Sequence, residues 1–219
     1  MFVEGTLRWQ VTEDCPWDLL MALALRDLGH LVGVGMPPIP RLSPALAPVF
    51  HPATGAHPLA GAGAHVEAAH PVTQSSAGLL ERQWLAWFEL TVDRERRPIV
   101  SLLRPPHFEA FDRAIELQDL IMEHYAEALS WTRERHAEYT RTSVEQHARR
   151  AADIVDVVHE REHELRRQAG YFRLDLSVLP VAERGAWIAG PHTVVVSASL
   201  RDDRRAFREW FTPVVAALV

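Results

Sequence analysis

Lysine and asparagine do not occur in this sequence of 219 residues, and all 23 basic residues are arginine. Without lysine the chain cannot form a Schiff base with a substrate or with pyridoxal phosphate, and it lacks the lysine of phosphate-binding loops and protein kinases. Without asparagine it has no N-glycosylation acceptor and no Cys-His-Asn triad. These absences exclude several enzyme classes before any motif is considered.

Cysteine and long apolar segments are also scarce. Cys15 is the only cysteine, which excludes an internal disulfide and any zinc site with several thiolate ligands. The longest purely apolar run, residues 19–25, is far shorter than the ~20 residues of a membrane-spanning helix. The N-terminal sequence has no signal-peptide pattern. We therefore expect a cytoplasmic protein without a membrane partner.

The formal net charge is −6. A general nucleic-acid binder normally carries clustered basic residues that neutralise phosphates, so we do not expect nucleic acid as a partner. With 47% hydrophobic residues, a chain of this length can bury one sizeable core. We expect a single α+β domain over residues 1–219, with a small molecule, a peptide substrate or a second copy of the chain as its partner.

Alternation of apolar and polar residues predicts strands in three parts of the chain. They are residues 7–12, residues 172–178, and a strand comprising 187–188 and 193–196. Pro191 interrupts the last strand, because proline cannot donate a hydrogen bond inside a sheet. We expect these strands to form a small, mostly antiparallel sheet.

Helical spacing of apolar residues predicts a helix at 17–28, which Gly29 would end as a left-handed cap. A last helix would start at Asp202 as its N-cap and break at Pro213. The segment in front of the central prolines fits two interpretations. One is a helix over 79–88 followed by hairpin strands at 88–93 and 99–103, and the other is a single helix through Val92.

Residues 36–76 are rich in proline, alanine, glycine and histidine and show no sustained periodicity. This composition predicts a long, flexible loop. Dense histidine in such a segment can bind metal ions, and a long loop can close over a site as a lid. The residues concerned are His51, His57, His65, His70 and Glu67.

The centre of the chain, residues 106–168, predicts a long antiparallel helical hairpin. The first helix follows two prolines and extends to about Thr140. Thr142 and Glu145 match the S/T-x-x-E capping box, which predicts that the second helix starts near Ser143. The expected fold is therefore α+β, with this hairpin packed against the sheet.

One recognisable catalytic pattern occurs in the second helix, at His159-Glu160-Arg161-Glu162-His163. It fits both HExxH and HxxEH. Histidines four apart lie on one face of a helix, so both imidazoles can reach one Zn²⁺ whose open position holds water. Over these five residues the chain resembles the zincin and inverzincin metallopeptidases. The resemblance implies a bound zinc ion and a glutamate that takes the proton of the bound water.

Helical geometry favours the inverted order of this pattern. At about 100° per residue, Glu160 points to solvent, whereas Glu162 lies beside His159 and His163 on the flank facing the other helix. We therefore expect the two histidines as metal ligands and Glu162 as the catalytic base. Residues equally distant from a turn at Arg141 lie opposite one another. The further metal ligands expected from the facing helix are Glu123, Asp119 and His124.

Three functions fit these features. The leading hypothesis is a zinc-dependent hydrolase with its site between the two helices. The second is a non-catalytic interaction or homodimerisation module, in which the charged stripe of the hairpin sets the register. The third is a small-molecule-binding protein with the loop 36–76 as its lid and tryptophan side chains in the pocket. The charged segment also fits a solvated helix face held by ion pairs.

Overall fold

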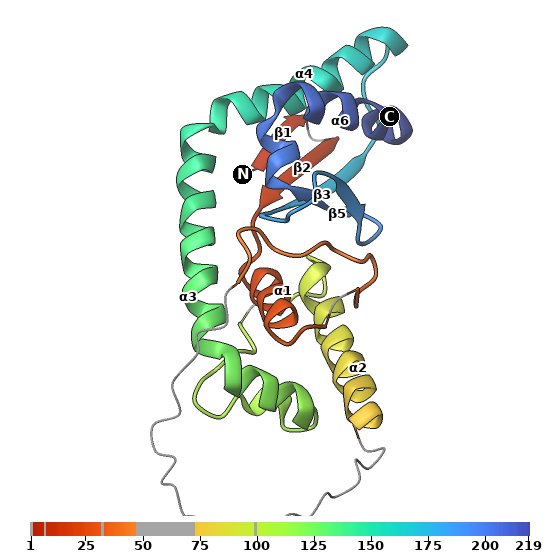
Figure 1. Cartoon of the computed structure of the whole chain (residues 1–219). Coiled ribbons are helices and arrows are strands. Elements are labelled where there is room, and N and C mark those ends of the chain that lie inside the picture. The colour runs from red at the N-terminus through yellow and green to blue at the C-terminus, as the bar shows by residue number, and fades with distance from the viewer. Residues whose placement is uncertain (1, 7, 32, 47–72, 99) are drawn as a thin grey trace, which may run out of the picture.

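The computed structural model describes residues 2–6, 8–31, 33–46, 73–98 and 100–219. A sheet with two helices on one face lies beside a group of three further helices (Figure 1). This mixture of helices and strands confirms the α+β class. Across the described ranges, no helix is both long and apolar enough to span a membrane.

Five strands of the described residues form one sheet, in the order β1-β2-β3-β5-β4. The strands are β1 (Phe2–Thr6), β2 (Trp9–Asp14), β3 (Phe172–Leu179), β4 (Ala186–Ile188) and β5 (Thr193–Ser197). The central strands β2, β3 and β5 are parallel, and the outer pairings of β1 with β2 and of β4 with β5 are antiparallel. A mostly antiparallel sheet was therefore a wrong expectation, because the long helical excursion between β2 and β3 returns the chain to the end of the sheet where β2 begins.

The strand predictions differ in their outcome. The strand predicted at 172–178 is confirmed by β3. The strand predicted at 7–12 is displaced, since β2 starts at Trp9 and Leu7 lies outside the described residues. The strand expected to run through Pro191 is instead two antiparallel neighbours, β4 and β5, because Pro191 lies in the turn that reverses the chain between them.

One face of the sheet is apolar and is covered by α4 (His147–Leu165) and α6 (Arg204–Leu218). Burying a large apolar side chain contributes about 1.5–3 kcal/mol, so this layer is a main source of stability for the sheet. The core residues include Trp9, Val11, Leu174 and Leu176 of the strands, Ile154 and Val157 of α4, and Phe207 and Phe211 of α6.

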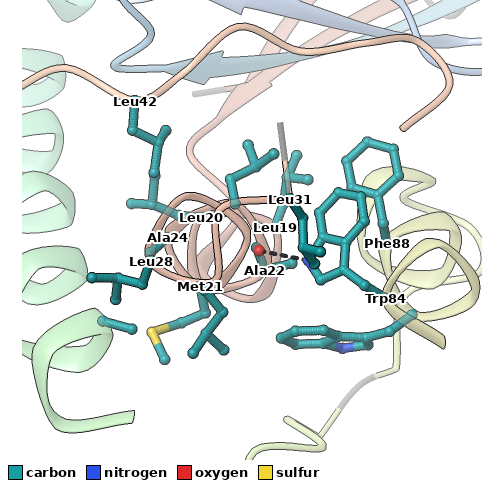
Figure 2. Packing of buried hydrophobic residues seen from close by; sticks show 14 of the residues in the cluster. Leu19, Leu20, Met21, Ala22, Ala24, Leu28, Leu31, Leu42, Trp84 and Phe88 are labelled. Atoms are coloured by element: carbon teal, nitrogen blue, oxygen red, sulfur yellow. Dashed lines mark hydrogen bonds between the residues drawn. The ribbon is translucent and has the colours of Figure 1, made fainter. Parts of the chain in front are cut away.

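A second core surrounds α1 (Trp17–Leu28), and this helix confirms the sequence prediction. Residues 19–25 are all fully buried, because α2 (Thr73–Val92), α3 (Ile115–Glu145) and the segment around Leu42 enclose α1 (Figure 2). The buried indole of Trp84 donates a hydrogen bond of 2.9 Å to the carbonyl oxygen of Ala22, which satisfies its polar atom inside this core.

The end of α1 differs from the expected left-handed cap. Gly29 has φ −78°, which any residue can adopt. A Cβ at this position would lie 2.6 Å from Cδ1 of Leu120. A glycine fits at this position because α3 approaches closely. The residue with the positive φ is His30, at 57°.

The segment before the central prolines forms a single helix. α2 continues through Val92, so the interpretation as a pair of hairpin strands was wrong. Of the second strand expected at 99–103, residues 100–103 carry no strand, and Ile99 lies outside the described residues. Trp84, Phe88 and Val92 lie one helical turn apart and are buried together in the α1 core, which makes the helix the better way to bury them. Its start at Thr73 also makes the end of the expected loop 36–76 helical.

Part of that loop lies outside the described residues, namely 47–72 with its four histidines. Residues 36–46 are described and carry no helix or strand. They are nevertheless tied to the sheet, because Leu42 forms an isolated bridge with Val181 and the Ser43 amide donates to the Pro180 carbonyl at 2.7 Å.

The antiparallel helical hairpin was a wrong expectation. Gln146 is the single residue between α3 and α4, and Arg141, the expected turn, lies inside α3 together with Thr142 and Glu145. α4 leaves the end of α3 sideways and does not run beside it (Figure 1). The apolar stripe of α4 is buried by the sheet and α6 instead of by α3, which is why the helices need not fold back on each other.

The C-terminal helix is preceded by a short helix, α5 (Ala198–Asp202). Asp202, the expected N-cap, ends α5, and the cap of α6 is Asp203, whose carboxylate accepts a hydrogen bond of 3.0 Å from the Ala206 amide. Pro213 lies inside α6 and does not break it. The buried residues Phe211 and Val215 on either side of the proline keep the helix packed on the sheet.

Candidate functional site

A pocket of about 350 Å³ opens at the carboxyl ends of β3 and β5. Ligands of open α/β sheets bind beyond the carboxyl ends of parallel strands, and small-molecule pockets commonly measure about 300–1,000 Å³. A hollow of about 510 Å³ on the loop 100–110 is larger, but a single exposed loop lines it. The candidate site is lined by Ser43, Pro44, Arg135, Glu138, Tyr139, Thr142, Arg150, Val178, Pro180, Val181, Ala198, Ser199 and Asp202.

The pocket has one apolar wall and one polar wall. Val178, Pro180 and Val181, at the end of β3 and just beyond it, form the apolar wall. The polar wall comes from residues 135, 138, 139 and 142 of α3. Residues 138 and 139 each lie three or four positions from both 135 and 142, so all four share a face of the helix. On this wall, Nη1 of Arg135 donates to Oε2 of Glu138 at 2.7 Å.

Arg150, in the first turn of α4, reaches the pocket from beneath. Its side chain is only 2% exposed. Nη1 donates to Oε1 of Glu13 at 2.8 Å, and Nη2 donates to Oδ1 of Asp202 at 2.6 Å. Burial acts to lower the pKa of Arg150, but the Glu13 carboxylate and the hydrogen bond to Asp202 outweigh burial and raise it. The pocket therefore contains a permanently charged guanidinium.

Glu13 holds this guanidinium in place from the sheet. It lies near the carboxyl end of β2, on the same face as Trp9 and Val11, and it is fully buried. Its second oxygen, Oε2, accepts a hydrogen bond of 2.6 Å from Nε of Arg201. Arg201 in turn donates through Nη2 to the Arg150 carbonyl at 3.0 Å. One buried carboxylate thus fixes two buried guanidiniums.

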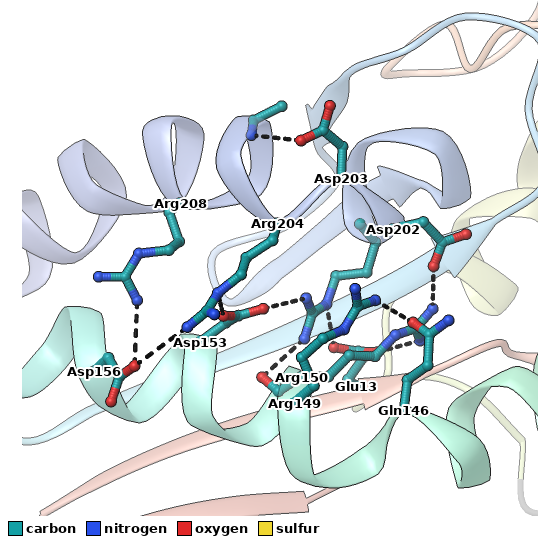
Figure 3. A network of polar contacts seen from close by, with 12 residues as sticks. Glu13, Gln146, Arg149, Arg150, Asp153, Asp156, Asp202, Asp203, Arg204 and Arg208 are labelled. Atoms are coloured by element: carbon teal, nitrogen blue, oxygen red, sulfur yellow. Dashed lines mark hydrogen bonds and ion pairs between the residues drawn. The ribbon is translucent and has the colours of Figure 1, made fainter.

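The network continues along α4 toward the surface (Figure 3). Asp153 is 1% exposed; its oxygens lie 3.8 Å from Nη1 of Arg201 and 2.6 Å from Nε of Arg204. The four deeply buried charges, Glu13, Asp153, Arg150 and Arg201, sum to zero, as buried charges must be compensated. The network therefore carries no net charge in its interior.

Tyr139 forms part of the polar wall and lies against Arg150. The guanidinium carbon of Arg150 is 5.9 Å from the centre of the Tyr139 ring. Burial raises the pKa of Tyr139, and the nearby Glu13 and Cys15 raise it further, against lowering by the Ser143 hydroxyl and Arg150. Tyr139 therefore stays a neutral phenol that can donate or accept a hydrogen bond.

A separate charged cluster lies on the other face of the sheet. Nη1 of Arg94 is 3.6 Å from both Oδ2 of Asp14 and Oδ1 of Asp175, and Nη1 of Arg97 is 3.7 Å from Asp14. Burial raises the pKa of Asp14 despite the two arginines. Burial also lowers the pKa of Arg97. The residues of this cluster do not line the pocket at the carboxyl ends of β3 and β5, so we do not place the site here.

The two histidines of the HEREH segment lie on the exposed surface of α4. They line a shallow recess together with Asp156, Glu160 and Glu164. Glu160 is exposed, as expected, and accepts a hydrogen bond of 2.6 Å from Arg208 of α6. Glu162, expected as the catalytic base, does not line the recess, because its Oε1 accepts a hydrogen bond of 2.7 Å from the Ala169 amide after α4.

The three further expected ligands, Asp119, Glu123 and His124, lie on α3 and do not meet His159 and His163. The register that placed them opposite one another required a turn at Arg141, which the structure does not contain. His124 instead lies 3.8 Å from Glu123 beside it. Within the described ranges, no group of three or more histidine, cysteine, aspartate or glutamate residues has a geometry that could hold a metal ion.

Sequence reasoning missed the residues of the pocket. A signal for Glu13 was present, because the alternation Trp9, Val11, Glu13 puts a carboxylate on the apolar face of β2. A buried acid requires a buried base, but 23 arginines offer too many partners to identify Arg150 and Arg201 without coordinates. Comparisons with protein-family models, curated proteins and solved structures find no match for this chain.

Proposed function

We propose that this protein binds a small organic molecule in the pocket between α3 and the carboxyl ends of β3 and β5. The observation that carries the proposal is the buried Arg150, which reaches the pocket and is held from below by the fully buried Glu13. Burying charges costs stability unless they are paired, and a buried guanidinium of fixed orientation at the bottom of a pocket is a common device of ligand recognition.

The walls support a ligand with both an apolar and a polar side. Val178, Pro180 and Val181 offer an apolar surface, while Arg135, Glu138 and Tyr139 offer hydrogen-bond donors and acceptors. Such a combination, mostly apolar with a few fixed polar groups, is typical of small-molecule sites. No nucleophile with an adjacent base stands out in the pocket, so we propose binding and not catalysis.

A pair of matched variants tests the proposal. Thr142 lines the pocket and Thr140, on the same helix, does not. A metabolite library is screened by the shift in melting temperature, and hits are then measured against Thr142→Trp and Thr140→Trp. Thr142→Trp fills the pocket and should abolish binding, whereas Thr140→Trp should retain it. Equal binding by the two variants would contradict the proposal.

The two other hypotheses from the sequence stay predictions. A zinc hydrolase would now rest on His159 and His163 alone, and zinc titration of His163→Ala against Glu123→Gln tests it: binding lost in the first variant and kept in the second is the expected result. The homodimer hypothesis relied on the helical hairpin, which the structure does not contain. Sedimentation at micromolar concentration measures the oligomeric state directly.

A further inference from the structure

We propose that the ligand of this pocket carries a carboxylate, which binds Arg150 in the place that Asp202 holds here. This inference rests on the proposed function and names the class of ligand. The Arg150 guanidinium forms two charge-assisted hydrogen bonds, one to Glu13 and one to Asp202. Only the second direction faces the pocket, since Asp202 lines it and Glu13 does not.

Glu13 cannot give up its place. It is completely buried, and both of its oxygens are engaged, one by Arg150 at 2.8 Å and the other by Arg201 at 2.6 Å. Releasing it would leave two buried guanidiniums without their shared carboxylate, which is strongly unfavourable. Glu13 therefore positions Arg150 and is not exchanged.

Asp202 is in the opposite situation. Its side chain is 47% exposed, so water can solvate the carboxylate as soon as it leaves Arg150. It ends the five-residue helix α5, and the next residue, Asp203, has extended backbone angles (φ −86°, ψ 99°) that separate α5 from α6. A rotation of the Asp202 side chain toward solvent breaks the hydrogen bond that it accepts from Arg150.

Charge balance also permits the exchange. The four buried charges of the network are neutral without Asp202, because Glu13 and Asp153 balance Arg150 and Arg201. Asp202 is therefore not needed to compensate the interior. A ligand carboxylate would replace the half-exposed Asp202 carboxylate as the partner of Arg150. The net charge of the four buried residues would stay the same.

The rest of the ligand follows from the walls around Arg150. Val178 and Val181, both buried side chains of the apolar wall, line the same pocket as Arg150, so an aliphatic or aromatic group should accompany the carboxylate. Arylcarboxylates such as benzoate have this shape. The neutral isostere benzamide has the same ring but cannot replace the charge of Asp202, which makes the two compounds a matched pair.

The experiment measures benzoate and benzamide binding to the full-length protein by calorimetry and ligand-observed NMR. The variants are Asp202→Asn, Asp202→Ser as a second replacement, and Glu209→Gln as a control, since Glu209 lies on α6 outside the pocket. If Asp202 occupies Arg150 for about nine-tenths of the time, removing this competitor tightens benzoate roughly tenfold. Benzamide affinity should stay within about twofold.

Each result has a defined meaning. Tighter benzoate binding in both Asp202 variants, with benzamide and Glu209→Gln unchanged, supports the exchange. Benzoate affinity unaffected by either Asp202 variant overturns it, as does benzamide binding Asp202→Asn as tightly as benzoate. Thr142→Trp separates this inference from the proposed function: if a hit from the library loses affinity in Thr142→Trp while benzoate does not respond to Asp202, the pocket function stands and the carboxylate class falls.

Discussion

Replacing Glu13 by glutamine tests the physical basis of the pocket. The substitution keeps the volume of the side chain but removes the negative charge that Arg150 and Arg201 share. Each lost charge-assisted hydrogen bond is worth about 1.5–3 kcal/mol, and removing one partner of a buried ion pair costs about 3–5 kcal/mol. The two routes agree, so we expect a loss of about 3–5 kcal/mol in the free energy of unfolding.

Urea denaturation followed by circular dichroism measures this loss. For a protein of this size, 1 kcal/mol corresponds to about 2–4 °C in melting temperature, so the melting temperature should fall by roughly 6–20 °C. The matched control is Glu209→Gln, which breaks an i,i+4 pair with Arg205 whose side chains are 88% and 64% exposed. This control should leave the free energy of unfolding nearly unchanged, because exposed ion pairs contribute little to stability.

A double-mutant cycle sharpens the test. If Glu13 stabilises the protein through Arg201, combining Glu13→Gln with Arg201→Gln should cost less than the sum of the single changes, by about 1–3 kcal/mol. A loss below about 1 kcal/mol for Glu13→Gln, or strict additivity in the cycle, would refute the reasoning. Either result would mean that the buried charges are solvated and that Arg150 is not held rigidly in the pocket.

Three further measurements probe other parts of the structure. Burial raises the pKa of the Cys15 thiol to about 12, with Asp14 acting in the same direction and Arg97 against it. Cys15 should therefore not react with Ellman's reagent at neutral pH until urea unfolds the protein. Rapid labelling in native buffer would contradict its burial. Gly78 lies inside α2, and an added Cβ would meet nothing within 4 Å, so Gly78→Ala should stabilise the protein by about 0.5–1 kcal/mol; a lower melting temperature would argue against a helix at this position. Burial raises the pKa of Asp14 above 3.8, so the protonated group favours the folded state and this contribution is lost as the pH rises through the raised pKa. Asp14→Asn should therefore melt higher than the wild type at pH 7, and the difference should shrink toward pH 3. A variant that is less stable at pH 7 would show that the ion pairs of Asp14 with the arginines dominate.

Local patterns were sufficient for elements in which a single periodicity fits the residues. The helix at 17–28 followed from a dense apolar run with a helix-compatible start, and the strand β3 followed from alternation. The single helix through Val92 was one of two interpretations, because the apolar residues fit a helical period up to Phe88 and a period of two from Phe88 to Val92. Only its burial against α1 decided between them.

The direction of α4 could not be read from its sequence. An amphipathic stripe shows that a helix must bury one face, but it does not show which surface buries it. The stripe with Ile154, Val157 and Val158 fits a facing helix as well as a sheet. In the structure it packs against the sheet. Because the hairpin does not form, the register that paired His159 and His163 with Glu123 is lost. The two histidines still share a face of α4, as their spacing requires.

Composition and spacing by themselves determined the α+β class, the first helix, the longest strand and the enzyme classes excluded by the lack of lysine and asparagine. The tertiary structure alone decided the parallel order of β2, β3 and β5, and with it the pocket at their carboxyl ends. Glu13, Arg150 and Arg201 lie up to 188 positions apart in the chain. Their meeting depends on how helices and sheet pack, since ion pairing chooses partners by distance in space, which no local period encodes.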